Sequence, residues 1–321
     1  MKEYNLIIIG GGLSGMTAAL SAMEEDTSNV LIIERESNLG GLLNRFICNG
    51  FGKKLLNVDL TGPEYINFIE NKLRSYPVEI KLNTEVLEVS EERVITYVNS
   101  YEGVTKVKGN AVILATGCRE KLTGSLTIPI NNIAGIYTVG NVQKIINLEG
   151  YLPGREPVVI AENRWAFMST RRMIIEGAKI KAFIINTQNG FEVNDEIMRL
   201  IEGFNIPIMY NCEIEGVYGE NRVEGVKIYS QENDAHTLIA CDSLVLSVGY
   251  FPEVRIVNKT SMKMNEKTLA PVVNNYETSV NGIFACGNLV YGLDAVLNTD
   301  INGGEVGNIV SKYLKSNFET I

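Results

Sequence analysis

The first 34 residues have an order of apolar and glycine-rich segments that few folds allow. Residues 5–9 (NLIII) form an apolar run that is too short for a helix and has the length of a buried parallel strand. The glycine-rich segment GGGLSG follows, then the helical segment MTAALSAMEE and a second apolar run over 30–34. This order of strand, glycine turn, helix and strand predicts a βαβ unit.

The glycine turn has a spacing that suits a phosphate group. Gly10, Gly12 and Gly15 follow the pattern GxGxxG, in which the first glycine permits the tight turn and the second lets the backbone approach a pyrophosphate. The third lets helix and strand pack closely, and the helix start offers N–H groups and a positive dipole end. Glu34 ends the second strand, where it can accept hydrogen bonds from ribose hydroxyls and would repel a 2′-phosphate. The pattern predicts a dinucleotide site that disfavours an NADP-type ligand; the structural alternative is a tight turn without a ligand.

A second βαβ unit is expected from about Pro157. The strand VVIAE is followed by a helix over 164–176 and a strand over 179–185, and after Gly249 the chain is expected to return to the first domain. Other expected helices cover 63–76 and 304–314, and other expected strands lie around 79–89, 93–98, 104–108, 111–115, 208–209, 213–218, 222–229, 243–248 and 282–285. The expected fold class is α/β, with two Rossmann-like, doubly wound, three-layer dinucleotide-binding domains, the second inserted into the first. The expected limits are 1–117 with 250–321 for the first domain and 118–249 for the second.

Composition narrows the function classes. The net charge of −9 and the pI near 5.0 argue against a nucleic-acid partner, which would need a basic surface. The five cysteines form no CxxC pair, which favours a reducing cytoplasm over a disulfide framework. A single histidine, His236, cannot build a multi-histidine metal site, and no run approaches the roughly 20 apolar residues of a membrane span. We therefore expect a cytoplasmic protein with no bound metal and no membrane span.

Several segments, taken in order, resemble the flavoproteins with two dinucleotide-binding domains, which include thioredoxin reductases and NADH oxidases. Glu34-Arg35 followed by Gly40-Gly41 looks like the family's second FAD segment, and Thr84-Glu85-Val86 resembles the strand whose backbone meets the adenine. Ala115-Thr116-Gly117 resembles the motif at the domain crossover. The sequence IFACGN over 283–288 resembles the late FAD motif, in which Asn288 replaces the usual aspartate. The resemblance implies an FAD-dependent oxidoreductase.

This resemblance also implies which residues contact FAD, while no catalytic residue is evident. The implied FAD contacts are Gly10, Gly12, Gly15, Glu34, Arg35, Gly41, Leu42, Val86, Ala115, Thr116, Gly117, Gly287, Asn288, Asp294, Ala295 and Val296.

A narrower resemblance comes from the segments NLGGLLNRFICNGFG, LTGPEY, ATGCRE, AGIYTVG, EGYLPG and RRMIIEGAK. They are similar to the small FAD proteins associated with anaerobic glycerol-3-phosphate dehydrogenase and to the FAD subunits of heteromeric amine and amino-acid dehydrogenases. That subgroup implies a partner dehydrogenase or electron-transfer subunit, and a homo-oligomer is left open. The missing CxxC disfavours a thioredoxin reductase.

The chain departs from the family where the second glycine loop should bind NAD(P)H. The place reads AENRWA over 161–166, without glycine, so side chains would obstruct a pyrophosphate and Glu162 would repel it. The next strand ends in Ile185-Asn186, without an acidic residue for the ribose. We expect that this domain does not bind NAD(P)H in the usual way; weaker binding by a surviving backbone geometry is the alternative.

Three functional hypotheses follow. In the first, the chain is an enzyme or enzyme subunit in which FAD passes reducing equivalents between a substrate or partner dehydrogenase and an acceptor. The second is an ordinary NAD(P)H-dependent FAD oxidoreductase, and the third is a non-catalytic FAD-binding structural subunit. Cys48 and Cys118 are more simply packing residues than redox thiols, and Trp165 either fills the vacated nucleotide space or forms a partner surface.

Overall fold

The computed structural model describes residues 1–122, 133–185, 192–292 and 299–318. The chain divides into two compact units. Unit 1 contains Met1–Arg119 and Phe251–Ile321, and unit 2 contains Glu120–Tyr250, so the second unit is inserted into the first. At the two passages between them, β9 (Cys118–Glu120) pairs with β18 (Tyr250–Pro252).

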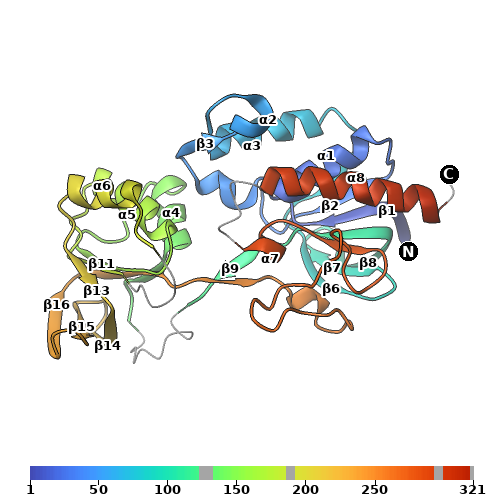
Figure 1. Ribbon diagram of the computed structural model, residues 1–321. Coiled ribbons are helices and arrows are strands. Elements are labelled where there is room, and N and C mark those ends of the chain that lie inside the picture. The colour runs from blue at the N-terminus through green and yellow to red at the C-terminus, as the bar shows by residue number, and fades with distance from the viewer. Residues whose placement is uncertain (123–132, 186–191, 293–298, 319–321) are drawn as a thin grey trace. The chain divides into compact units, whose positions relative to one another are not determined.

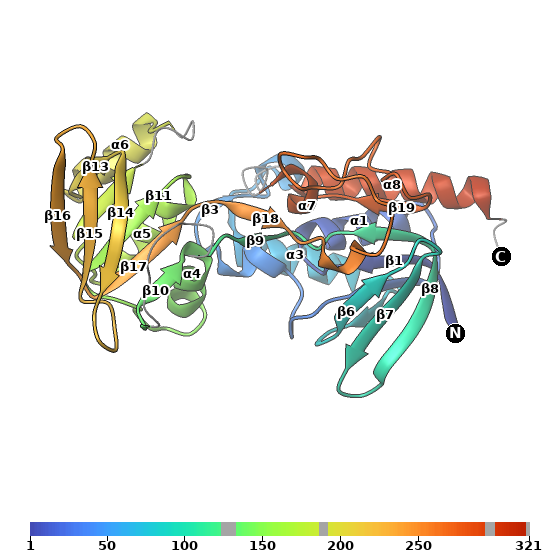
Figure 2. The same cartoon turned by 90° about the horizontal axis from the view of Figure 1, so that it is seen from below.

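Unit 1 is built on a sheet with strand order β5-β2-β1-β8-β7-β6, in which β19 also pairs with β8 (Figures 1 and 2). The strands are β1 (Lys2–Ile9), β2 (Val30–Ile33), β5 (Glu79–Lys81), β6 (Glu85–Val89), β7 (Val94–Asn99), β8 (Gly103–Leu114) and β19 (Ile283–Ala285). β5, β2, β1, β8 and β19 run parallel, whereas β7 is antiparallel to both β6 and β8. The carboxyl ends of β1, β2, β8 and β19 therefore meet at one edge, where parallel sheets bind ligands.

The long helices of unit 1 cover the face of the parallel strands that is opposite the layer formed by β6 and β7 (Figure 1). The long ones are α1 (Leu13–Glu24), α3 (Gly62–Leu73) and α8 (Thr299–Asn317); the short elements are η1 (Gly41–Arg45), β3 (Asn49–Phe51), α2 (Lys53–Leu56), β4 (Leu60–Thr61), η3 (Arg255–Val257) and α7 (Asn288–Tyr291). α8 can lie close on α1 because a Cβ at Gly307 would come 2.4 Å from the Ala18 carbonyl oxygen. On the other face, Ile7, Leu31 and Val112 belong to a core completed by the β6–β7 layer.

Unit 2 has three layers of its own. Its five parallel strands have the order β10-β17-β11-β12-β13, and an antiparallel sheet β14-β15-β16 forms a second strand layer. The elements are β10 (Ile136–Thr138), α4 (Val139–Asn147), β11 (Pro157–Ala161), α5 (Trp165–Ile175), β12 (Ala182–Ile185), α6 (Asp195–Gly203), β13 (Ile208–Tyr210), β14 (Cys212–Tyr218), β15 (Gly225–Ser230), β16 (Ala235–Ala240) and β17 (Ser243–Ser247). Val158 and Leu244 of the first sheet share a core with Val226 of the second, and the helices cover the opposite face (Figure 1). The predicted fold class is confirmed.

Several expected boundaries were wrong in detail. The strands expected at 104–108 and 111–115 form one strand, β8, because β1 pairs along both halves, from Lys2 opposite Val107 to Ile9 opposite Leu114. The helix expected over 63–76 ends at Leu73, and the closing helix begins earlier and ends later than the expected 304–314. Helices α4 and α6 were not expected from the sequence.

Candidate functional site

The turn after β1 has a backbone that only glycine accommodates. Gly10 has φ +107°, and a Cβ there would lie 2.3 Å from the Ala115 carbonyl oxygen. At Gly15, in the first turn of α1, a Cβ would lie 1.9 Å from the Gly10 carbonyl oxygen. Both glycines are therefore required by the protein's own packing, the first against β8 and the second between helix and turn.

Gly12 differs from its two neighbours because the space beside it is open. A Cβ at Gly12 would meet no protein atom within 4 Å, and its φ of −71° suits any residue. Gly12 also precedes α1, whose first turn has no side-chain cap from the Gly12 position and no acidic residue. The start of α1 therefore directs its N–H groups and positive dipole end toward open space.

A second glycine segment lies beside the first. Gly40 donates its N–H to the Gly11 carbonyl oxygen at 2.8 Å and forms a parallel bridge with Gly12. A Cβ at Gly41 would lie 3.2 Å from the Gly12 Cα. Two stretches of bare backbone therefore run side by side in front of α1.

Glu34 stands at the carboxyl end of β2, and its side chain is 6% exposed. Its carboxylate accepts the Gly11 N–H at 2.6 Å and the Glu36 N–H at 2.8 Å. These two bonds fix the carboxylate, and each oxygen keeps a lone pair for a further donor. Fixed at this edge, the carboxylate can accept a hydroxyl hydrogen bond from a ligand in front of α1.

These segments line one pocket, which lies within unit 1. The expected site residues that the pocket brings together are Gly10, Gly12, Glu34, Arg35, Gly41, Leu42, Val86, Ala115, Thr116, Gly117 and Asn288. Gly15 and Gly287 stand outside the lining: a Cβ at Gly287, which has φ +67°, would come 2.3 Å from the Ser14 Oγ. Asp294, Ala295 and Val296 lie outside the described residues.

Asn288 begins α7 on the wall of this pocket. Its Oδ1 is buried and has no hydrogen-bond partner among the described residues. A buried polar oxygen without a partner is costly, and in a pocket wall it indicates a donor supplied from outside the chain.

The sequence did not reveal a cluster of charges around Glu253 at the same pocket. The Glu253 side chain is 6% exposed and forms ion pairs with Arg119, with Arg255 at 3.1 Å and with Arg35 at 3.7 Å. Burial, followed by the nearby Arg255 and Arg35, lowers the pKa of the Arg119 guanidinium. Glu253 also donates its N–H to the Gly117 carbonyl oxygen at 3.0 Å and accepts the Thr116 hydroxyl through its own carbonyl oxygen at 2.7 Å. Glu253 thus holds the segment 116–119 in place on the pocket wall.

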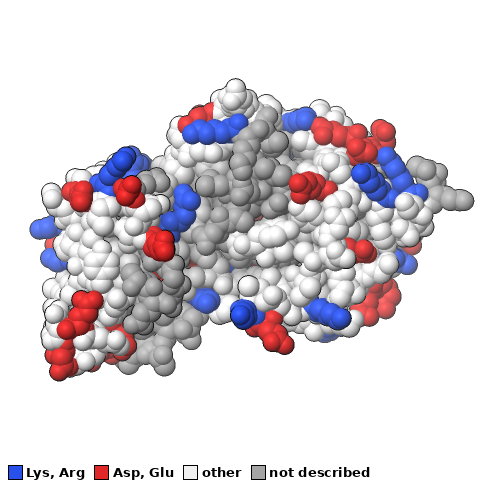
Figure 3. Space-filling model, viewed as in Figure 1, with Lys and Arg blue, Asp and Glu red and all other residues white. Residues whose placement is uncertain are grey.

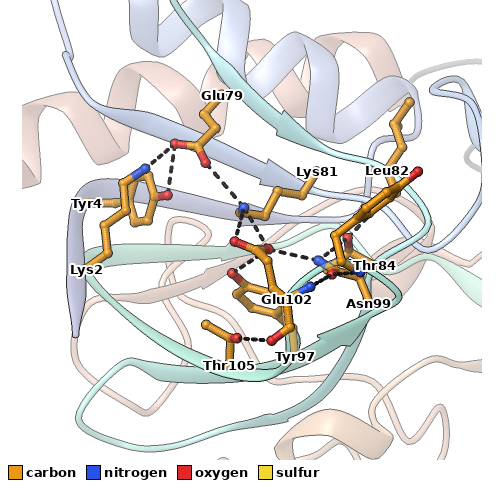
Figure 4. A network of polar contacts seen from close by, with 11 residues as sticks. Lys2, Tyr4, Glu79, Lys81, Leu82, Thr84, Tyr97, Asn99, Glu102 and Thr105 are labelled. Atoms are coloured by element: carbon orange, nitrogen blue, oxygen red, sulfur yellow. Dashed lines mark hydrogen bonds and ion pairs between the residues drawn. The ribbon is translucent and has the colours of Figure 1, made fainter.

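The pocket residue Thr84 belongs to a network of polar side chains (Figure 4). Glu102 accepts hydrogen bonds from Asn99 at 2.9 Å, from Lys81 at 2.9 Å and from the Tyr97 hydroxyl at 3.1 Å. Asn99 also donates to the Thr84 Oγ1 at 3.3 Å. The network therefore ties the β7–β8 turn to the segment between β5 and β6.

The cysteines differ in their surroundings. Cys118 is half-buried and lines the pocket, and Cys48 is half-buried beside β3. Burial raises the pKa of the Cys286 thiol to about 12, so that this thiol stays protonated at neutral pH. Cys286 is therefore a core residue.

In the altered loop of unit 2, AENRWA over 161–166, side chains stand where the family has glycines. Trp165 and Ala166, which replace the expected glycine positions, are 3% and 0% exposed. Arg164 lies over the Trp165 ring, with its guanidinium carbon 5.4 Å from the ring centroid. The tryptophan therefore belongs to the packed interior of unit 2.

The surface carries charges of both signs. On the face drawn in Figure 3, the described Lys and Arg side chains are interspersed with Asp and Glu side chains. Among the described residues, no three His, Cys, Asp or Glu side chains gather closely enough to hold a metal ion. Within the same residues, no helix has both the length and the apolar character needed to cross a bilayer.

Comparison with known proteins gives relatives over almost the whole chain. A "34.2 kDa protein in rubredoxin operon" of Clostridium pasteurianum is 25% identical over 319 residues, with 98% of both chains covered. The hydrogen cyanide synthase subunit HcnB of Pseudomonas protegens is 29% identical over 164 residues, which are 50% of this chain and 33% of that subunit. Among solved structures, thioredoxin reductase of T. acidophilum superposes with a TM-score of 0.77 at 20% identity, covering 98% of this chain and 99% of that one.

The family of this chain follows from a match to the sequence model of that family. The pattern described as pyridine nucleotide-disulphide oxidoreductase matches residues 4–151 and 177–303. The gap at 152–176 contains the altered loop of unit 2. The chain therefore belongs to the pyridine nucleotide-disulphide oxidoreductase family, whose members bind FAD, and is an FAD-dependent oxidoreductase.

Proposed function

We propose that the pocket of unit 1 holds the FAD. The observation that carries this proposal is the start of α1, where Gly12 leaves open space before an N-terminus without a side-chain cap. A diphosphate placed there would accept the N–H groups of the helix start, and the Gly40-Gly41 backbone would form the opposite wall. Glu34 would accept the ribose hydroxyls of the adenosine half.

The remaining pocket residues fit the other parts of the same ligand. Thr84, Glu85 and Val86 would meet the adenine through their backbone, and Arg35 would lie beside them. Ala115, Thr116 and Gly117 would follow the cofactor along the end of β8, and Gly287 would support Asn288 beside the ribityl-phosphate region. The Asn288 Oδ1 can accept a hydrogen bond there but cannot repel phosphate as a carboxylate would. Asp294, Ala295 and Val296 stay predicted flavin contacts.

Bound FAD supplies the redox chemistry, and the chain supplies position and a local electrostatic environment. Gly12 keeps the entrance of α1 free, and Glu34 selects an unphosphorylated ribose. Arg35 and Arg255 line this part of the wall, but they pair with Glu36 and Glu85 as well as with Glu253. The phosphates would therefore be held by the backbone N–H groups at the start of α1 and not by a net positive charge of the wall.

We further propose that the electrons do not come from NAD(P)H in the way usual for the family. The support is the loop AENRWA, which has no glycine and whose Trp165 and Ala166 are buried. The donor or acceptor is then a substrate or a partner dehydrogenase. The matches to HcnB and to a protein from a rubredoxin operon support such an electron-transfer partner, as does the resemblance to proteins associated with anaerobic glycerol-3-phosphate dehydrogenase.

Two measurements test this proposal. The chromophore released from the purified protein should be FAD, and the flavin should stay oxidised when NADH or NADPH is added without oxygen. Rapid bleaching by either nucleotide would support the alternative of an NAD(P)H-dependent oxidoreductase. A partner subunit isolated with the protein, supplied with its substrate, should reduce the flavin. If the flavin stays oxidised, the alternative of a non-catalytic FAD-binding subunit is supported.

A further inference from the structure

Three helices of unit 2 begin at one edge of its sheet. β10, β11 and β12 run parallel, and α4, α5 and α6 are the next helices after them, so all three N-termini lie at the carboxyl edge. In a dinucleotide-binding fold this edge receives the ligand, and the phosphates bind to free N–H groups at a helix start. The state of these N–H groups therefore decides whether unit 2 can bind a dinucleotide.

At α5 the N–H groups are taken by the chain itself. The Asn163 Oδ1 accepts the Trp165 N–H at 3.1 Å, and the Asn163 and Arg164 carbonyl oxygens accept the Ala166 and Phe167 N–H groups. Asn163 is held by Ser247 at the end of β17, which donates its hydroxyl to the same Oδ1 at 2.7 Å. A carboxamide thus occupies the position that suits a phosphate oxygen.

At α4 the occupant is a carboxylate. Glu120 accepts the Gly140 N–H at 2.7 Å and also the hydroxyl of Thr138, whose Oγ1 in turn accepts the Asn141 N–H. A Cβ at Gly140 would lie 2.5 Å from the Glu120 Oε2, so this glycine makes room for the chain's own anion. A negative charge at this helix start would also repel a pyrophosphate.

At the start of α6 a side chain of the protein also accepts a backbone N–H, whereas at the start of α1 in unit 1 the Gly12 position has no side chain that could do so. The Asn194 side chain accepts the Ile197 N–H at the start of α6. In contrast, α1 begins at Gly12 without a side-chain cap and opens into the pocket. The two units therefore share a plan and treat the phosphate position in opposite ways.

We infer that Glu120 and Asn163 are the residues that close unit 2 to the pyrophosphate of a nicotinamide dinucleotide. Asn163 occupies the start of α5, where the pyrophosphate would bind, and Glu120 places a carboxylate at the start of α4, the helix packed beside α5. This inference rests on the proposed function, in which the reducing equivalents come from elsewhere, and names the side chains responsible.

Trp165 is the chain's single tryptophan and is the first residue of α5, so its emission reports on this edge directly. The flavin-loaded full chain is titrated with NADH and, separately, with inorganic pyrophosphate. For the natural sequence we expect no saturable change of Trp165 emission in the millimolar range. The variant Glu120→Ala/Asn163→Gly should show saturable pyrophosphate binding in this range, as the freed N–H groups and the lost charge predict.

The matched control is Asn265→Gly in unit 1. The Oδ1 of Asn265, like that of Asn163, accepts backbone N–H hydrogen bonds from residues that follow it, here Lys267 and Thr268. The control should behave like the natural sequence. A saturable NADH response of the natural sequence would overturn the inference even if the double variant failed to fold. A folded double variant that gains no pyrophosphate affinity would overturn it as well.

The readouts separate the inference from the proposed function. NADH that reduces the flavin without changing Trp165 emission would contradict the proposed electron source and leave the closed edge of unit 2 supported. NADH that changes the emission without reducing the flavin would overturn the closed edge and leave the proposed electron source supported.

Discussion

Among single residues, the three glycines of the turn after β1 are required for different reasons. Gly10 and Gly15 are required by contacts inside the protein, with the Ala115 and Gly10 carbonyl oxygens respectively. Gly12 has an ordinary backbone conformation and no neighbour for a Cβ. Its lack of a side chain therefore serves something outside the chain.

This difference predicts that Gly12→Val separates folding from cofactor binding. We expect the flavin-free variant to lose no more than about 1 kcal/mol relative to the flavin-free parent, because a Cβ at Gly12 meets open space and the main cost is that of a poorer N-cap residue. Flavin affinity should fall at least tenfold or so, because the side chain would enter the phosphate position. Urea unfolding and flavin titration measure the two effects. Gly10→Ala is the control, and it should lose stability; a Gly12→Val protein that retains its flavin would contradict the assignment.

Glu253 is the second residue with a testable role. The change Glu253→Gln leaves Arg119 and Arg255 without their buried counter-ion, and we expect a loss of roughly 1–3 kcal/mol, because a buried charge pair is broken while the arginines stay partly solvated. Chemical denaturation measures it, with the exposed Glu266→Gln as control. Equal stability of the two variants would show that the Glu253 carboxylate adds no stability through its ion pairs with Arg119 and Arg255.

Among the secondary-structure elements, the turn between β7 and β8 is stabilised by the hydrogen bonds that Glu102 accepts. Hydrogen bonds from Asn99 and then Lys81 lower the pKa of Glu102 to about 2 (Figure 4). Because the folded-state pKa lies below the ordinary value of 4.5, the carboxylate contributes stability above about pH 4.5. That contribution is lost as the pH falls toward 2.

The variant Glu102→Gln should therefore be less stable than its parent at pH 7, and the difference should shrink as the pH falls below 4.5. Denaturation midpoints measured at pH 7 and at about pH 3 give the two differences. A difference that does not change with pH would mean that the charge of Glu102 contributes nothing to the turn.

At the scale of the whole molecule, the chain consists of a discontinuous unit and a continuous one. Unit 2 spans Glu120–Tyr250 and has its own core, which includes Val158, Val226 and Leu244. A segment of this size with its own core can fold alone.

We expect the fragment 120–250, expressed alone, to unfold cooperatively and to bind no flavin. Circular dichroism during heating and absorption in the visible range measure both properties. The complementary chain, with 120–250 replaced by a short linker, should keep the flavin. A fragment that unfolds without a transition would contradict the independence of unit 2.

The amino-acid sequence by itself determined the local plan. The glycine spacing, the apolar runs and Glu34 predicted the βαβ start, the α/β class and the insertion, because strand length, turn chemistry and periodicity act over short distances along the chain. The assignment of Gly15 and Gly287 to the cofactor site stays a prediction, since spacing cannot tell a glycine needed by a ligand from one needed by packing.

The contacts between residues far apart in the sequence become visible in the folded chain alone. Arg119 and Glu253 are 134 residues apart in sequence, and Asn163 and Ser247 are 84 apart. No local sequence pattern predicts either pair, because side-chain partners on separate strands depend on sheet order and register. Folding also brings Glu120 of β9 to the start of α4, so that its carboxylate accepts the Gly140 N–H.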